Sequence, residues 1–190
     1  MLDRRKLVAR LLAERGDLLV VAGLGSSTYD VTACGDHPLN FYIWSAMGST
    51  AMVGLGIALA RPDRRVAVIT GDGDVLMAFG SLATVGVKQP RNLSIVVLDN
   101  GHYAATGMQP SHTAAGVDLA ATARACRFAH VTSITELGAA AEMRTLLHSG
   151  HGPIFIHARV APDDQPRIMP SRDGIAIKQR FVQASAATES

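Results

Sequence analysis

The chain has little that would suggest a disulfide framework, a metal cluster or an export signal. Its 190 residues include only two cysteines, Cys34 and Cys126, which stand far from each other and from any histidine-rich spacing. This argues against a zinc or iron–sulfur site and favours a reducing cytoplasm. Residues 1–15 mix charges with leucines at helical spacing, unlike the uninterrupted apolar centre of a signal peptide. We therefore expect a cytoplasmic protein.

An excess of charge of one sign is also absent. The chain has 18 Lys and Arg against 16 Asp and Glu, and the net charge of +2 forms no dense basic stripe of the kind that binds nucleic acid. The most apolar stretch, residues 46–60, is shorter than the ~20 residues that cross a bilayer and contains three glycines. We expect neither a polynucleotide partner nor membrane insertion. With 48% hydrophobic residues, the composition is that of one compact domain.

Four short apolar runs rich in β-branched residues predict buried strands. They span residues 18–22, 66–70, 93–98 and 154–158. Their two faces are equally apolar, which is typical of parallel strands covered by helices on both faces. Helical patterns fall between or after them, at 50–60, within 75–87, at 119–126 and at 134–148. This alternation predicts an α/β fold with a doubly wound, mostly parallel sheet.

We expect a single domain over residues 1–183. From residue 161 onward, three prolines and mixed charge predict an extended arm, followed by a short helix near 175–182. Residues 184–190 are small and polar, and they predict a disordered tail.

Polar and glycine-rich loops follow three of the predicted strands, at residues 23–27, 71–74 and 99–107. In doubly wound sheets, ligands bind at these carboxyl ends. Asp72 follows one strand and Asn100 the next, so two oxygen ligands suited to Mg²⁺ would meet at neighbouring strand ends. The glycines on either side of Asp72 would let backbone N–H groups approach phosphate oxygens.

This pattern resembles that of thiamine diphosphate enzymes, in which a Gly-Asp-Gly triplet is followed just under thirty residues later by Asn. Within them, the chain is most similar to the sulfopyruvate and phosphonopyruvate decarboxylases. The resemblance runs from about residue 4 to 160 and is carried by residues 48–49, 54–60, 62–64, 71–83, 98–103, 106–107 and 109–110. It implies the thiamine diphosphate-binding fold and a subunit that decarboxylates a 2-oxoacid with a partner.

The resemblance implies that Mg²⁺ is bound by the side chains of Asp72 and Asn100 and by the backbone carbonyl of His102. It implies cofactor contacts from Gly25, Ser26, Ser27, Ser45, Ala46, Met47, Gly71, Asp72, Gly73, Asp74, Asn100, His102 and Tyr103. Met47 would support the bent cofactor, which brings the aminopyrimidine nitrogen near the reactive thiazolium carbon. Two residues depart from the family pattern, Asp74 in place of Ser or Ala and Asp99 in place of Asn. A carboxylate at position 74 would be repelled by a diphosphate unless it turned away or contacted the metal.

Plainer interpretations of the same residues remain open. Residues 71–74 could be a turn in which Asp72 caps the next helix. Met47 could be an ordinary core methionine. His102 and His112 are most simply solvated loop histidines.

Other functions also fit parts of the pattern. Asp72 and Asp74 after an apolar strand are spaced like the nucleophile and acid of haloacid-dehalogenase-like phosphatases, although the small hydroxyl residue expected at position 76 is a leucine. An acetolactate-synthase-like carboligase, an oxidoreductase subunit and a non-catalytic thiamine diphosphate-binding module are further alternatives.

The resemblance also implies that something must come from another chain. Thiamine diphosphate enzymes need a glutamate against the aminopyrimidine ring, and in this family it belongs to a separate pyrimidine-binding domain. The glutamates of this chain lie on predicted helices away from the strand-end loops or in the tail: Glu14, Glu136, Glu142 and Glu189. We therefore expect a pyrimidine-binding partner subunit that supplies the glutamate.

Overall fold

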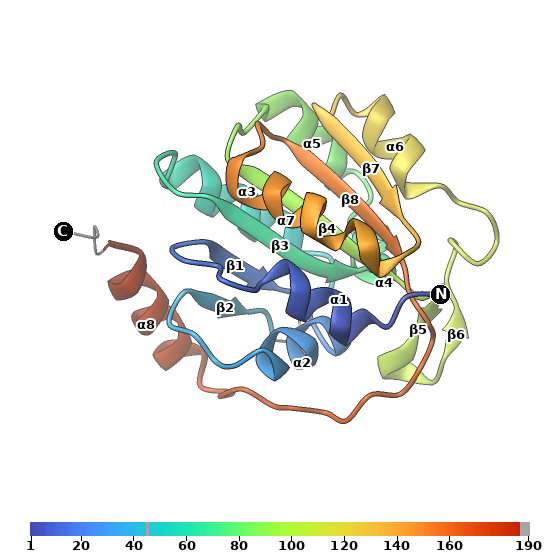
Figure 1. The fold of residues 1–190 in the computed structure, drawn as a ribbon, viewed down its shortest axis with the longest axis horizontal. Helices are drawn as coiled ribbons and strands as arrows, with labels where there is room; N and C mark the ends of the chain where they lie inside the picture. Colours follow the sequence, from blue (N-terminus) through green and yellow to red (C-terminus); the bar gives the residue numbers. More distant parts are fainter. Residues whose placement is uncertain (45, 187–190) are drawn as a thin grey trace.

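A six-stranded parallel sheet forms the centre of the protein (Figure 1). The computed structural model describes residues 1–44 and 46–186. The strands lie in the order β2-β1-β3-β4-β8-β7, and every pair in this sheet is parallel. Their bounds are β1 Leu19–Ala22, β2 Asn40–Tyr42, β3 Val66–Gly71, β4 Leu93–Asp99, β7 His130–Ile134 and β8 Ile154–Arg159. The mostly parallel sheet expected from the sequence is confirmed.

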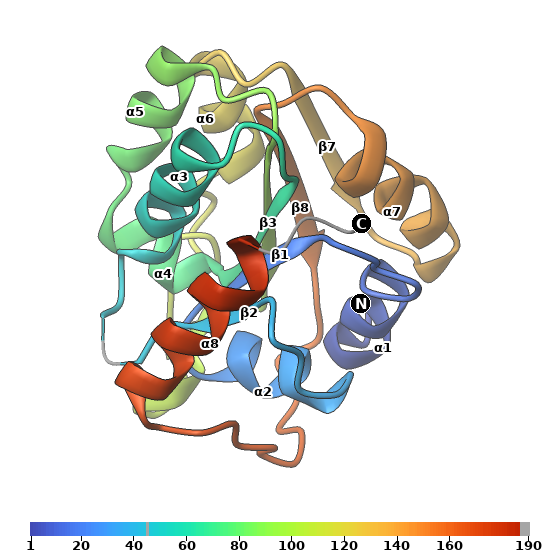
Figure 2. The same ribbon diagram turned by 90° about the vertical axis from the view of Figure 1, so that its left-hand side faces the viewer.

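Helices cover both faces of the sheet, as Figure 2 shows from the side. One face is covered by α1 (Arg4–Leu11), α2 (Ser26–Ala33) and α7 (Ala140–Ser149). The other is covered by α3 (Thr50–Ala60), α4 (Asp72–Met77), α5 (Ser81–Lys88) and α6 (Leu119–Ala125). No helix among the described residues is long and apolar enough to cross a bilayer.

Alternation along the strands explains why the chain needs both helical layers. In β1, Val20 and Ala22 pack into the core under α1 and α7, whereas Leu19 and Val21 pack into the core under α3 and α5. All four are fully buried. Since successive side chains of a strand point to opposite faces, a strand that is apolar throughout is stable only where both faces are covered.

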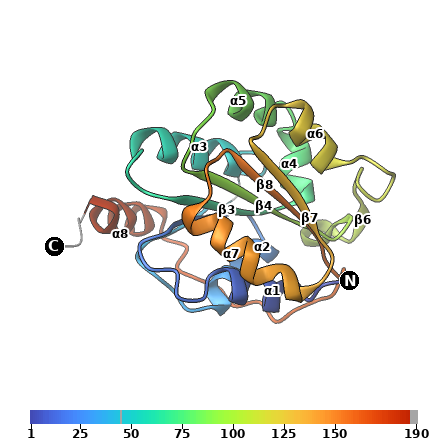
Figure 3. The same cartoon turned by 45° about the horizontal axis from the view of Figure 1, so that its top comes forward.

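The C-terminal segment crosses the molecule before it ends in α8 (Gly174–Ala186). The arm leaves β8, runs along the lower side of the molecule in Figure 1, and delivers α8 to the edge strand β2 (Figures 1 and 3). Phe181 of α8 packs edge-on against Phe41 of β2, with 5.4 Å between ring centroids. At 13 residues, α8 is longer than the helix that the sequence predicted at 175–182. The assignment of residues 184–186 to a disordered tail is wrong, because α8 includes them.

Among the described elements of the main sheet and its helical layers, β2, β7 and α2 were not predicted from the sequence. In addition, the pattern at 75–87 contains two helices rather than one, and the pattern at 134–148 begins with the end of β7 and a 3₁₀ turn, η2 (Leu137–Ala139), before α7 starts at Ala140. A small antiparallel hairpin, β5 (His102–Tyr103) and β6 (Gln109–Pro110), projects after β4 with η1 (Ala104–Thr106) between its strands.

The sheet changes direction between β1 and β3. The chain moves outward from β1 to β2, and then returns to place β3 on the other side of β1. In doubly wound folds, the loops that follow the two strands at such a switch point diverge and leave a crevice. Here those loops are the 23–27 and 71–74 segments.

Candidate cofactor and metal site

A cavity of about 110 Å³ lies at this switch point. It is lined by most of the residues that the sequence predicted: Gly25, Ser26, Ser27, Met47, Gly71, Asp72, Gly73, Asp74, Asn100, His102 and Tyr103. Ser45 lies outside the described residues. Ala46 is not among the lining residues; its carbonyl accepts hydrogen bonds from the backbone and hydroxyl of Ser49. The three loops at the carboxyl ends of β1, β3 and β4 therefore meet in one place.

The start of α2 forms one wall. Gly25 adopts a φ of 73°, a left-handed conformation that glycine accepts readily, and Ser26 and Ser27 begin the helix. The free N–H groups of a helix N-terminus attract anions. Arg4, which the sequence did not single out, also lines this wall, and its guanidinium donates to the buried Asp30 carboxylate at 2.7 Å.

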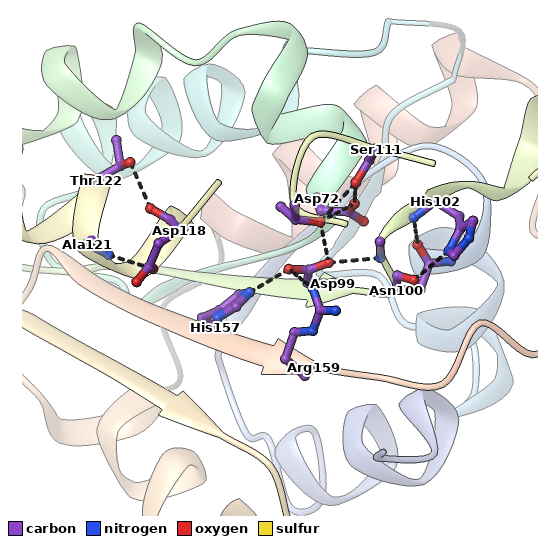
Figure 4. Close-up of polar contacts among 12 residues, drawn as sticks. Asp72, Asp99, Asn100, His102, Ser111, Asp118, Ala121, Thr122, His157 and Arg159 are labelled. Atoms are coloured by element: carbon purple, nitrogen blue, oxygen red, sulfur yellow. Dashed lines mark hydrogen bonds and ion pairs between the residues drawn. The ribbon is translucent and has the colours of Figure 1, made fainter. Parts of the chain in front are cut away.

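Asp72 is buried at the floor of the cavity. Its Oδ2 accepts hydrogen bonds from the hydroxyls of Ser111, at 2.5 Å, and Thr113, at 3.2 Å (Figure 4). Burial raises the pKa of Asp72, and the nearby charge of Asp99 raises it further, although the Ser111 hydrogen bond opposes both. The alternative that Asp72 caps a helix is wrong, because α4 begins at Asp72 itself, its N-cap is Gly71, and no side chain caps it.

Asp99 is held by four donors. They are the ring of His157 at 2.7 Å, Arg159 at 2.9 Å, the Thr113 hydroxyl at 2.8 Å and the backbone N–H of Gly101 at 2.9 Å (Figure 4). Burial alone would raise the pKa of this carboxyl, but the hydrogen bonds from His157, Thr113 and Arg159 lower it to about 2. Both Asp99 oxygens accept hydrogen bonds in these contacts, so the carboxylate connects the loop after β4 to strand β8.

Asn100 and His102 form a tight local turn beside the cavity. The Asn100 side-chain oxygen accepts the backbone N–H of His102 at 2.9 Å, and His102 Nδ1 lies 2.8 Å from the Asn100 carbonyl. Since a carbonyl only accepts, Nδ1 carries the proton. His102 and Pro110 form a non-hydrogen-bonded pair of the hairpin, because the neighbouring bonds run from the Ser111 N–H to the Gly101 carbonyl and from the Met108 N–H to the Tyr103 carbonyl. In such a pair the His102 carbonyl points away from the partner strand, where another ligand can reach it. His112 is exposed, as expected for a solvated loop histidine.

Asp74 lines the cavity, but both of its carboxylate oxygens are engaged by other residues. One oxygen accepts the backbone N–H of Gly48 and the other accepts the hydroxyl of Thr70. Asp72 and Asp74 thus contact different elements and do not form the facing pair that a phosphatase needs.

Met47 is 36% exposed and is not a core methionine. Gly73 separates Met47 from Tyr103: a Cβ there would stand 2.6 Å from the Tyr103 ring and 3.0 Å from Met47 Cε.

Comparison with known proteins accounts for this arrangement. The family described as thiamine pyrophosphate enzyme, C-terminal TPP binding domain, matches residues 23–158, where thiamine pyrophosphate is another name for thiamine diphosphate. The chain belongs to this family. That membership sets the phosphatase alternative aside, and the matched residues include the three loops that line the cavity between β1 and β3.

The chain is similar to two kinds of decarboxylase. It is 34% identical to the sulfopyruvate decarboxylase subunit beta of Methanothermobacter thermautotrophicus, over 100% of this chain and 99% of the relative. It is 41% identical to the phosphonopyruvate decarboxylase of Streptomyces viridochromogenes, over 90% of this chain but 43% of the relative. Among solved structures, a 2-oxoglutarate:ferredoxin oxidoreductase from Magnetococcus marinus shares the fold, with a TM-score of 0.69 and 20% identity over 86% of this chain and 63% of that one.

Several site residues escaped the sequence analysis. Ser111 and Thr113 lie about forty residues after Asp72 in an irregular segment, and His157 and Arg159 lie on β8. The alternating polar residues at the end of β8 were the only signal that could have drawn attention to His157 and Arg159, because the rest of that strand is apolar.

Proposed function

We propose that this chain is the diphosphate- and magnesium-binding subunit of a two-subunit, thiamine diphosphate-dependent 2-oxoacid decarboxylase of the sulfopyruvate and phosphonopyruvate type. The observation that carries the proposal is one of length. The chain spans 99% of a sulfopyruvate decarboxylase beta subunit, whereas it matches 43% of a phosphonopyruvate decarboxylase. The relative that the chain matches over nearly its whole length is named as a beta subunit, which supports a second chain in the enzyme. The two free cysteines support a cytoplasmic location.

The residues around the cavity fit the cofactor. Asp72 Oδ2 accepts the Ser111 hydroxyl, with the Thr113 hydroxyl 3.2 Å away, which leaves Oδ1 for Mg²⁺, and the Asn100 side chain and the His102 carbonyl add two neutral oxygens. Within the described residues, no group of three or more His, Cys, Asp and Glu side chains could hold a metal ion. One carboxylate with neutral oxygens is the donor set that Mg²⁺ takes when phosphate oxygens complete its shell. A Cβ at Gly73 would displace the Tyr103 ring, which lines the cavity.

In the assembled enzyme, bound thiamine diphosphate would supply a carbon nucleophile for the 2-oxo group and would take up the electrons released with carbon dioxide. The part of this chain is binding and orientation. The N-terminus of α2 and Arg4 face the diphosphate side of the cavity, Asp72 and Asn100 hold the metal, and Met47 supports the bent conformation. Holding the reacting groups in contact lowers the entropic part of the barrier.

The activating glutamate would come from the partner. None of the glutamates in the described residues lines the cavity; Glu14, for example, pairs with Arg144 at 3.3 Å. An apolar face beside the cavity supports a partner at this place. It is formed by the exposed side chains of Met47, Met52, Leu59, Met77 and Phe79 on and around α3 and α4. Such a face on a soluble domain marks an interaction site, and here it is continuous with the cofactor cavity through Met47.

The test is carbon dioxide release from sulfopyruvate, phosphonopyruvate and pyruvate. The purified chain would be assayed with thiamine diphosphate and Mg²⁺, first alone and then with a candidate pyrimidine-binding chain encoded beside it. We expect no turnover by the single chain and turnover when both chains are present. Robust decarboxylation by this chain alone would show that the activating group lies within its 190 residues. Cofactor binding without turnover in any combination would favour the non-catalytic module.

A further inference from the structure

We propose that Asp74 is a positioning residue that fixes the Met47 turn against α4. The inference rests on the proposed function, since it concerns how the chain holds the cofactor in its reactive shape. Asp74 is 7% exposed, and both carboxylate oxygens are engaged: one with the backbone N–H of Gly48, the other with the hydroxyl of Thr70 in β3. The residue that departs from the family pattern thereby joins two of the loops that form the cavity.

The Met47 turn, residues 46–49, needs such an anchor. Its internal hydrogen bonds run from the backbone N–H and the hydroxyl of Ser49 to the Ala46 carbonyl, at 3.1 and 2.6 Å. Gly48 occupies the left-handed region with a φ of 93°, and a Cβ there would press against Ala78 at 3.3 Å. These contacts shape the turn but do not connect it to the sheet. The hydrogen bond from Gly48 to Asp74 connects the turn to α4 and, through Thr70, to β3.

The surroundings of Asp74 hold the carboxylate in one orientation. A Cβ on Gly23, at the end of β1, would stand 2.7 Å from the Thr70 hydroxyl and 3.3 Å from Asp74 Oδ2. The carboxylate therefore lies between the ends of β1 and β3, and the hydroxyl of the buried Thr50 at the start of α3 also lies beside Gly23. A charged acceptor that is buried in this way forms a stronger hydrogen bond to a backbone N–H than a neutral one does.

Asp72 and Asp74 consequently divide the first turn of α4 between two tasks. Asp72 faces the metal position and is oriented by Ser111, whereas Asp74 faces the Met47 turn. Loss of the Asp74 carboxylate would release Met47 but leave the contacts of Asp72 in place. The cofactor rings would then be less well aligned, while the contacts to the diphosphate would remain. Turnover should therefore fall more than the affinity for the cofactor.

The first measurement needs no activity. Amide hydrogen exchange at Gly48, followed by NMR in the metal-free chain, should accelerate about tenfold or more in Asp74→Ala, since a hydrogen bond to a charged group is lost. Asp74→Asn should exchange at a rate between wild type and Asp74→Ala, because the amide oxygen can still accept from Gly48 while its NH₂ group donates to Thr70, but the acceptor is neutral. Asp118→Ala is the matched control: it removes a carboxylate that accepts from a backbone N–H, at Ala121, in the exposed cap of α6.

The second measurement uses the assembled enzyme. Turnover of Asp74→Ala should fall on the order of 10- to 100-fold, while cofactor affinity measured by titration calorimetry changes by less than about threefold. Unchanged exchange at Gly48 would overturn the anchor, and equal losses of affinity and turnover would overturn the positioning role. If the wild-type assembly binds no thiamine diphosphate, the proposed function fails, and with it the role of Asp74 toward the cofactor; faster exchange would then record only a structural bond.

Discussion

Ser111 and Thr113 carry one hydroxyl proton each, and two buried carboxylates compete for them. The Ser111 proton goes to Asp72, at 2.5 Å, and the Thr113 proton goes to Asp99, its nearer carboxylate, at 2.8 Å. Asp99 is further neutralised by Arg159, whereas no cation contacts Asp72 among the residues drawn in Figure 4. A divalent ion on the free oxygen of Asp72 would supply a positive charge there. Ser111 thus holds the Asp72 carboxylate, and Thr113 holds that of Asp99.

Ser111→Ala should therefore weaken the binding of Mg²⁺ and thiamine diphosphate without unfolding the chain. Removing a group that orients a metal ligand costs about 10- to 100-fold in affinity. Titration calorimetry on the isolated chain would measure this loss, with Asp72→Ala as the reference for complete loss of magnesium-dependent binding. Ser149→Ala, which removes an exposed hydroxyl bonded to the Thr145 carbonyl on α7, is the control. An unchanged affinity in Ser111→Ala would contradict the orienting role, and an unchanged affinity in Asp72→Ala would refute the metal assignment.

The sequence predicted the residues that form the cavity walls but not those behind them. Gly71 to Asp74 and Asn100 follow apolar strands directly, so their position at one edge of the sheet could be derived from strand order. Ser111 and Thr113 sit in an irregular segment without periodicity, and only the folded chain brings them to Asp72. The orientation of the Asp74 side chain could not be predicted either, because it is set by a hydrogen bond to Gly48 in the Met47 turn, and no local sequence pattern predicts where that turn lies.

At the scale of elements, α8 and the edge strand β2 stabilise each other. Phe181 is 5% exposed and packs against Phe41, and Arg180 pairs with Asp36 at 2.6 Å with both side chains about one-third or more exposed. We expect Phe181→Ala to lower the free energy of unfolding by about 3 kcal/mol, as for other buried aromatic side chains. Arg180→Ala should cost less than about 1 kcal/mol, because the ion pair is screened by solvent. Urea denaturation would compare them, with the exposed Val182→Ala as the control.

The Arg180 contribution should also depend on pH. Partial burial raises the pKa of Asp36, but the hydrogen bond from Arg180 outweighs it together with the other donors, and the pKa is lowered from 3.8. A carboxyl whose pKa is lowered by folding stabilises the fold above its unfolded pKa and loses that effect as the pH falls through the folded value. The small difference between wild type and Arg180→Ala should therefore be lost as the pH falls through the lowered pKa of Asp36. A difference that persisted there would point to packing rather than charge.

Helices and strands could be predicted where an uninterrupted apolar run or a clear helical spacing marks their buried residues. The four central strands are apolar on both faces and were found, whereas β2 has three residues and begins with Asn40, and β7 is half-exposed and polar in sequence. The helix α2 was missed because its sequence, Ser-Ser-Thr-Tyr-Asp, is typical of a loop; it is helical because Val31 packs into the core while Asp30 pairs with Arg4 and Arg5. In each case tertiary contacts overrode local propensity.

At the scale of the whole molecule, Met47 links the cavity to the exposed apolar residues. It lines the cavity and is 36% exposed, and a Cβ at Gly48 would stand 3.4 Å from Met77 Cβ, so the Met47 turn packs against the end of α4. On α3, Met52, Gly56 and Leu59 follow one another at helical spacing on the exposed side. A partner that covers this surface would exclude water from the cofactor rings and would deliver its glutamate at the same time.

Met77→Asp should prevent assembly with the pyrimidine-binding partner while leaving cofactor binding by the isolated chain intact. Met77 is 63% exposed, so the substitution disturbs no core, but a buried and unpaired carboxylate at an interface is costly. Light scattering of the mixed chains would measure the loss of the complex, and calorimetry with thiamine diphosphate and Mg²⁺ would verify the site. Val87→Asp is the matched control, because Val87 is an equally apolar and 78% exposed residue on α5 outside the apolar face. If Met77→Asp assembled normally and Val87→Asp did not, the partner would bind over α5, and the glutamate would have to reach the cofactor from another side.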